Sequence, residues 1–190
     1  MKISLKKALI LFSGIATIGL YTSCNNANGK NPEKNKDETT KITILQTADI
    51  HGQLDSHPEL FWEDEEIVFK ERGGLAHIQT LFEEERAKNP NTVIFDGGDL
   101  IQGSGYAALS EGKIFPEIIK NIDYDLLVPG NWEVVYGKKV MMNVLQGFET
   151  PVIVQNMFHQ EDNKELFPPY WTKEIEGVKL GFIGINDPDV

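Results

Sequence analysis

The sequence predicts an α/β fold with a mostly parallel sheet and a C-terminal hairpin. Short β-branched runs alternate along the chain with amphipathic segments of helical period, which is the order found in βαβ units. The runs are apolar throughout, as expected for parallel strands that are buried on both faces. A hairpin pattern replaces this alternation at residues 170–185.

The expected elements follow one another from residue 42. Strands are predicted at 42–47, 92–99, 124–131 and 151–156, and helices at 73–89, 112–122 and 137–146. The first helix shows the pattern best, because its apolar residues at 75, 78, 81 and 82 lie opposite charged ones. In the second, Pro116 is tolerated only near the first turn.

Two further segments are predicted to contain hairpin or loop structure. Residues 170–185 form a hairpin pattern with its turn near Glu176 and Gly177. Residues 53–72, which include the run "FWEDEEIVF", predict either an inserted loop or a small edge hairpin.

The N-terminal residues have the composition of an export signal. Three lysines precede the apolar run "ALILFSGIATIGLY", which is too short to span a bilayer comfortably and fits a secretory signal peptide at 1–23. Cys24, the only cysteine, follows directly and resembles the lipid-modified cysteine of a bacterial lipobox, although Tyr21 stands where leucine is usual. The alternative is an ordinary signal peptide with an incidental cysteine. Residues 24–41 predict a flexible tether.

These features predict an exported bacterial lipoprotein that touches the membrane only through its N-terminal lipid anchor. The formal net charge of −11 argues against a nucleic-acid polymer or an anionic membrane surface as partner. An acidic protein can still act on small phosphate esters when a bound metal offsets its negative field.

Polar side chains gather where the predicted strands end. Asp49 and His51 follow the first strand, Asp99 follows the second after two glycines, and Asn131 follows the third. Taken singly, the Asp-x-His pair could be a solvated turn, Asp99 a helix N-cap, and Asn131 a left-handed turn residue. Because open α/β sheets place their sites beyond the carboxyl ends of the strands, the three motifs together predict a site for divalent Mn, Zn, Fe or a similar ion.

These motifs carry a resemblance to a known family. "ILQTADIHGQL", "GGLA", "IFDGGDLIQGS", "VPGNWEVVYG" and "GVKLGFIGI" resemble, in order and spacing, the calcineurin-like metallophosphoesterases, in particular their 5′-nucleotidase branch. The resemblance implies half of a four-layer α/β/β/α sandwich and a hydrolase of phosphate esters such as nucleoside monophosphates. It also implies two divalent metal ions, with Asp49 and His51 on the first, Asp99 bridging both, and Asn131 on the second.

Trp132 departs from the family pattern. The family has histidine after the asparagine ("GNHE"), and the nucleotidase branch adds an aspartate three residues later, where this chain has Val135. Indole donates one hydrogen bond but cannot shuttle a proton. Trp132 therefore predicts altered or lost leaving-group catalysis. The alternatives are an inactive lipid-anchored binding protein, or a hydrolase of a sulfur-containing substrate, since the thiosulfohydrolases are similar in having "HWE" here.

The length of the chain predicts a partial catalytic domain at 42–190. The family supplies further histidines from later loops, whereas this chain has only His159 after Asn131, in a polar stretch that predicts a turn. His57 and His77 are expected to be structural.

Overall fold

The computed structural model describes residues 39–187. The expected signal peptide, Cys24 and nearly all of the expected tether lie outside the described residues. Within 39–187, no helix combines the length and the apolar character needed to cross a membrane.

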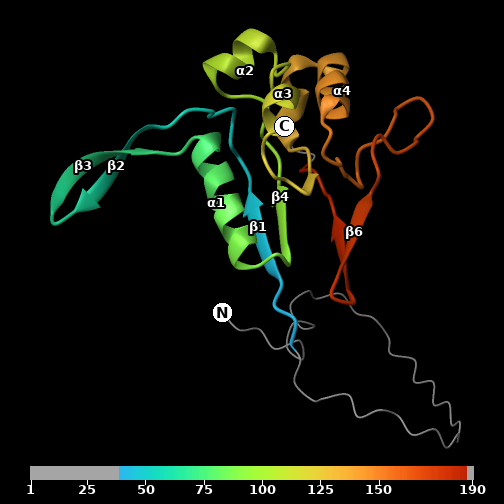
Figure 1. Cartoon of the computed structure of the whole chain (residues 1–190). Helices are drawn as coiled ribbons and strands as arrows, with labels where there is room; N and C mark the ends of the chain where they lie inside the picture. The colour runs from blue at the N-terminus through green and yellow to red at the C-terminus, as the bar shows by residue number, and fades with distance from the viewer. Residues whose placement is uncertain (1–38, 188–190) are drawn as a thin grey trace, which may run out of the picture. The chain divides into compact units, whose positions relative to one another are not determined.

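Strands and short helices alternate along the described chain (Figure 1). In chain order they are β1 (Thr43–Thr47), β2 (His57–Glu63), β3 (Glu66–Arg72), α1 (Leu75–Lys88), β4 (Thr92–Asp96), α2 (Gly105–Ser110), α3 (Phe115–Ile119), β5 (Leu126–Leu127), the 3-10 helix η1 (Asn131–Tyr136), α4 (Lys138–Gly147), β6 (Tyr170–Ile175) and β7 (Val178–Ile183).

The central sheet is parallel and has the strand order β1–β4–β5. Thr43 pairs with Thr92 and Thr47 with Asp96, so β1 and β4 begin and end together. β5 pairs with the last two residues of β4. The register brings the carboxyl ends of the three strands to the same edge of the sheet, which positions the loops that follow them.

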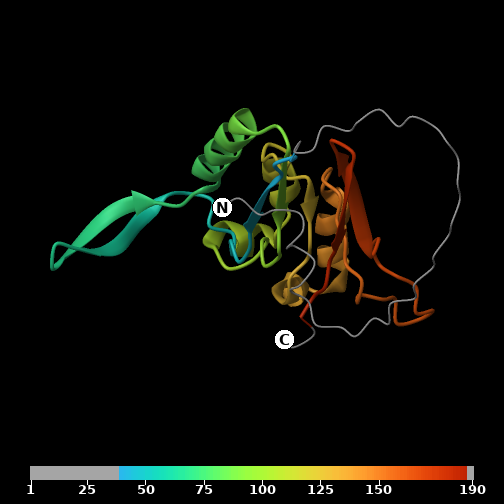
Figure 2. The same ribbon diagram turned by 90° about the horizontal axis from the view of Figure 1, so that it is seen from below.

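The sheet lies between α1 and the β6–β7 hairpin, and both views show these two elements on opposite sides of it (Figure 2). Successive side chains of β4 point to opposite faces. Ile94 joins the core cluster that includes Leu75 and Phe82 of α1. Phe95 meets Phe182 of β7, with the ring centroids 5.8 Å apart. The prediction of a mixed α/β fold with a parallel sheet and a C-terminal hairpin is confirmed.

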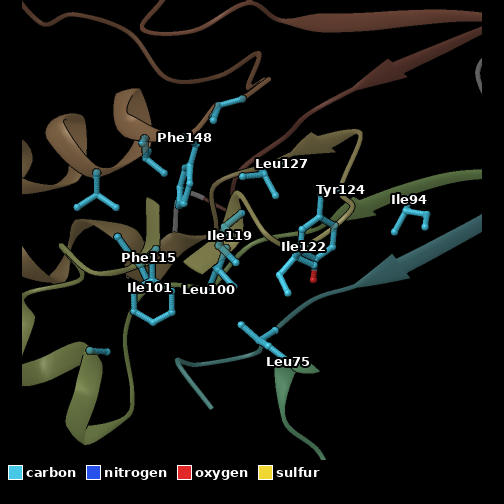
Figure 3. Close-up of a cluster of buried hydrophobic side chains, with 14 of the residues drawn as sticks. Leu75, Ile94, Leu100, Ile101, Phe115, Ile119, Ile122, Tyr124, Leu127 and Phe148 are labelled. Atoms are coloured by element: carbon cyan, nitrogen blue, oxygen red, sulfur yellow. The ribbon is translucent and has the colours of Figure 1, made fainter. Parts of the chain in front are cut away.

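The main hydrophobic core fills the space between this sheet and the helices (Figure 3). Phe115 and Ile119 of α3 are fully buried beside Ile101. Tyr124 packs edge-on against Phe82, with the ring centroids 5.3 Å apart. Burial of a large apolar side chain stabilises the folded chain by about 1.5–3 kcal/mol. Leu100 and Ile101 of the loop after β4 belong to this core, so the core holds that loop in place.

Residues 53–72 contain an antiparallel hairpin, one of the two alternatives predicted. β2 and β3 pair along their whole length, and Figure 1 shows them extending away from the central sheet. Leu60, Trp62, Ile67 and Phe69 share one face of this ribbon and are each at least half exposed. The second predicted hairpin, β6–β7, is confirmed with its turn at Glu176–Gly177, where both residues have positive φ.

Two of the expected strands are wrong in extent. The strand predicted at 124–131 is only Leu126–Leu127, and 151–156 forms a single bridge between Val152 and Leu127. Beyond that bridge the backbone finds other partners, because the N–H of Val154 donates to Pro168 and that of Gln155 to Gly184. The apolar pattern predicted the burial of these two segments correctly, but it did not predict their hydrogen-bond partners.

The helix predicted at 112–122 is also shorter than expected. It spans Phe115–Ile119, begins with Pro116 in its first turn, and follows Gly112, whose φ of +74° is not helical. α2 was not expected at all. Its N-terminus is capped by Ser104, whose hydroxyl accepts the N–H of Ala107.

Asp125, just before β5, joins three elements through its carboxylate. It accepts hydrogen bonds from the backbone N–H of Ile94 (2.9 Å), from Arg86 of α1 (2.9 Å) and from Lys173 of β6 (2.6 Å). Burial alone would raise the pKa of Asp125, but these hydrogen bonds and the charge of Arg86 outweigh burial and lower it below the ordinary value.

Asp125→Asn is expected to destabilise the fold by about 2 kcal/mol at neutral pH, because charge-assisted hydrogen bonds are lost from a largely buried position. A lowered pKa in the folded state stabilises the fold only above the ordinary pKa of 3.8. The difference between variant and wild type should therefore shrink as the pH falls through the folded pKa. Chemical denaturation at several pH values measures this. Glu117→Gln, at an exposed ion pair, is the control, and a pH-independent difference would contradict the prediction.

Candidate metal centre

Four polar side chains lie beyond the carboxyl ends of the central strands. Asp49 and His51 belong to the loop after β1, Asp99 to the loop after β4, and Asn131 begins η1 after β5. The loops after β1 and β4 run side by side, since the N–H of Asp49 donates to the carbonyl of Gly98 and that of His51 to the carbonyl of Asp99. The parallel register of the sheet thus brings these segments together.

Three of the four side chains form a compact cluster. Asp49, His51 and Asp99 each offer one ligand atom, and these atoms all lie within 4.8 Å of one another. His51 Nε2 is 3.6 Å from an Asp49 oxygen and 4.0 Å from an Asp99 oxygen. Asp99 is buried, whereas the Asp49 side chain is 70% exposed. Asn131 lines the same cleft of about 190 Å³ as the two aspartates.

The backbone at the cluster is unusual. Asp49, His51 and Asp99 have φ values of 56°, 50° and 57°, in the left-handed region that non-glycine residues rarely adopt. Such residues cluster at functional sites, where surrounding structure holds them in place. Here the paired loops and the core beneath them supply that restraint.

Two glycines allow the loops after β4 and β5 to touch. A Cβ on Gly98 would overlap the backbone of Gly130, and a Cβ on Gly130 would overlap Asp99. The N–H of Trp132 then donates to an Asp99 oxygen at 2.9 Å. The close approach therefore holds the Asp99 carboxylate against the start of η1.

Glu133 is a buried residue of the centre that the sequence analysis did not single out. It is 1% exposed, and its carboxylate accepts backbone N–H groups from Asp99 (3.2 Å), Leu100 (2.7 Å) and Ile101 (3.4 Å). Burial is the main cause that raises its pKa, and the neighbouring Asp99 charge adds to the effect. The signals in the sequence are an acid placed among the apolar residues of "WEVVY" and its match to the glutamate of the family's "GNHE".

A second buried carboxylate lies below the centre, at the end of β4. Asp96 accepts a hydrogen bond from Thr47 (2.6 Å) and another from the N–H of Gly98 (2.9 Å), and Thr47 bonds in turn to the Tyr124 hydroxyl. Burial raises the pKa of Asp96 to about 7, against the opposing effect of its hydrogen bonds. Burial of Asp96 therefore favours its neutral form more than is usual for an aspartate.

Asn186 and Gln102 are two further buried polar residues that the sequence analysis missed. Asn186, after β7, donates to the carbonyl of Gly130 at 2.9 Å and lines the cleft beside Asn131. Gln102 contacts Nδ1 of His51. Gln102 lies within the motif "IFDGGDLIQGS" and Asn186 directly follows "GVKLGFIGI", but neither was given a role, because their roles depend on loops that only the folded chain brings together.

The remaining singled-out residues contribute no side chain to the cluster. Trp132, the second residue of η1, contacts Asp99 only through its backbone N–H, and both its side chain (45% exposed) and Val135 are exposed. His57 contacts Glu59 on β2, and His77 contacts the carbonyl of Gly73. His159 lies in a turn, as expected, where its N–H donates to the carbonyl of Lys164.

Known proteins resemble this chain over most of its length. The family model described as calcineurin-like phosphoesterase matches residues 42–186. A 2′,3′-cyclic-nucleotide 2′-phosphodiesterase/3′-nucleotidase of Salmonella typhimurium is 30% identical over 80% of this chain and 25% of its own length. A 5′-nucleotidase of Vibrio cholerae is 25% identical over 97% of this chain and 32% of its own.

The fold is shared with solved structures. A 5′-nucleotidase precursor from Thermus thermophilus has a TM-score of 0.66 and 28% identity, over 77% of this chain and 29% of that one. In these comparisons the chain spans about a quarter to a third of the proteins that it matches.

Proposed function

The chain belongs to the calcineurin-like phosphoesterase family, and from this premise we propose that it carries the N-terminal part of a metal-dependent phosphoesterase site for small phosphate esters such as nucleoside monophosphates. The observation that supports the proposal is the cluster of Asp49, His51 and Asp99 at the carboxyl edge of the sheet. The proposed partial catalytic domain is 42–190.

The residues present fit divalent ions. Two carboxylates, an imidazole and an amide in one cleft are the mixed oxygen and nitrogen ligands that Mn, Zn or Fe accept. We propose that Asp49 and His51 hold one ion, that Asn131 holds a second, and that Asp99 contacts both. Such ions polarise a phosphoryl group and activate water.

The chain's own groups position these side chains. Glu133 holds the backbone of residues 99–101, and Trp132 N–H fixes one oxygen of Asp99, which leaves its other oxygen toward His51. The cleft has no lysine or arginine among its lining residues in the described part of the chain. An anionic substrate therefore depends on bound cations to offset the carboxylates.

The test of the proposal is ion binding and hydrolysis by the full chain. We expect the metal-stripped protein to bind Mn²⁺ in calorimetry, and Mn²⁺ to restore hydrolysis of p-nitrophenyl phosphate and of nucleoside monophosphates. Absence of bound metal by elemental analysis, together with no Mn²⁺-dependent hydrolysis, would leave the second candidate, a non-catalytic binding lipoprotein. Trp132 and Val135 favour that candidate, because they replace the family's proton-handling pair.

Trp132→His is expected to raise kcat/KM on esters with poor leaving groups, such as nucleoside monophosphates, by about 100-fold, which is the lower end of general-acid catalysis. Hydrolysis of p-nitrophenyl phosphate should change little, because its leaving group needs less help from a proton donor. Trp132→Phe, which restores no acid, is the matched control. An equal change on both substrates would show that proton donation was not the limitation, and would favour a substrate with a good leaving group, such as a sulfur-containing one.

We also propose that the protein is exported and anchored through Cys24, with residues 1–23 as its signal peptide and 24–41 as a tether. The support is the order of charged, apolar and cysteine residues in the sequence.

A further inference from the structure

We propose that Gln102 is a positioning residue for His51: its buried side-chain amide holds Nδ1 of the imidazole, and its amide oxygen accepts the Nδ1–H when Nε2 holds an ion. This inference rests on the proposed function, because it takes His51 as a metal ligand.

The two ring nitrogens of His51 have different surroundings. Nδ1 contacts the side chain of Gln102, and Nε2 faces carboxylate oxygens of Asp49 (3.6 Å) and Asp99 (4.0 Å). Gln102 is only 8% exposed. A Cβ on the next residue, Gly103, would lie within 3 Å of the backbone and Cβ of His51, so this segment packs tightly against the histidine. The amide therefore stays at Nδ1.

A neutral imidazole carries one N–H and one lone pair. The side chain of Gln102 contacts His51 Nδ1, so its amide can accept from Nδ1 when that nitrogen carries the ring proton and donate to it when it does not.

Metal binding requires one particular tautomer of His51. An ion at Nε2 needs the lone pair there, so the ring proton must lie on Nδ1, where it needs an acceptor. Rotating the Gln102 amide by half a turn replaces its nitrogen with its oxygen at the same place. Glutamine can serve both tautomers because its amide holds a donor and an acceptor, whereas a carboxylate or an apolar side chain cannot.

The simpler explanation is that Gln102 is a buried polar side chain that bonds to the nearest ring. Removal of Gln102 would then lower stability without changing either the tautomer of His51 or its affinity for an ion. The two explanations differ in a spectroscopic signature, and this makes the role testable without an activity assay.

Nitrogen-15 NMR of the full chain reads the tautomer directly. His77 supplies an internal reference, because its Nδ1 lies 2.7 Å from the carbonyl of Gly73 and must donate there. We expect His51 to carry its proton on Nδ1 once Zn²⁺ is bound. In Gln102→Glu, which offers only acceptors, the Nδ1–H form is expected even without metal.

The affinity for Zn²⁺ provides the second readout. Gln102→Leu should weaken binding by about 10- to 100-fold, the usual effect of losing a partner of a ligating histidine. Gln102→Glu should bind at least as tightly as wild type, and Gln146→Leu, on an exposed face of α4, should be neutral. Equal affinity of wild type and Gln102→Leu for Zn²⁺ would overturn the inference. Failure of wild type to bind Zn²⁺ would instead overturn the proposed function.

Discussion

Asp99→Asn is expected to lower the affinity for Mn²⁺ by about 100- to 1000-fold, and to remove metal-dependent hydrolysis with it. Asp99 is the buried carboxylate of the cluster and lies nearest to the segment that carries Asn131. Asparagine retains the shape and the oxygen that accepts the Trp132 N–H, so the fold should persist while the charge is lost. The result would therefore report on ligand chemistry and not on folding.

Calorimetric titration of the metal-stripped protein with Mn²⁺ measures the effect, and circular dichroism confirms that the variant is folded. Asp162→Asn is the matched control, because Asp162 lies in the exposed turn that contains His159 and pairs with Lys164. Unchanged Mn²⁺ affinity in Asp99→Asn would show that this cluster is not the metal site.

Glu133→Ala is expected to lower the free energy of unfolding by about 3–5 kcal/mol, because truncation leaves three buried backbone N–H groups without their acceptor. These groups belong to residues 99–101, so the loop that carries Asp99 should also lose its conformation. We expect weaker Mn²⁺ binding even under conditions where the variant remains folded.

Urea denaturation and hydrogen exchange of residues 99–101 measure the two consequences separately. Glu133→Gln retains one acceptor oxygen and should lie between wild type and alanine, and Glu174→Ala on the exposed face of β6 should be neutral. Equal stability of wild type and Glu133→Ala would mean that the loop is held by its other contacts.

The local patterns that depend on neighbouring residues could be predicted well from the sequence. The helix α1 and the turn of the β6–β7 hairpin need only a few adjacent residues to be recognised, and both are confirmed, although Leu81 of the predicted apolar face is exposed. The convergence of Asp49 and Asp99 followed from the rule that parallel strands end at one edge. Their roles as metal ligands stay predictions.

The features that depend on distant partners could not be predicted in the same way. Leu126–Leu127 is a short strand because the following backbone bonds to segments near Pro151 and Asn186, which lie far along the chain. The sequence alone offered no reason to expect Glu133 to be buried, since charged residues are rarely buried unless paired. Only the folded loop supplies the three donors that make its burial favourable.

The left-handed conformations at Asp49, His51 and Asp99 imply a conflict between the stability of the fold and the activity of the site. Each left-handed residue costs about 1–3 kcal/mol of backbone strain. The carboxylates of Asp49 and Asp99 also repel each other, because they carry like charges in one cluster. Asparagine adopts this conformation readily and removes one charge, so a chain selected only for heat resistance would exchange the exposed aspartate at position 49 for asparagine. We therefore expect Asp49→Asn to raise the melting temperature of the metal-stripped protein and to weaken its affinity for a divalent ion.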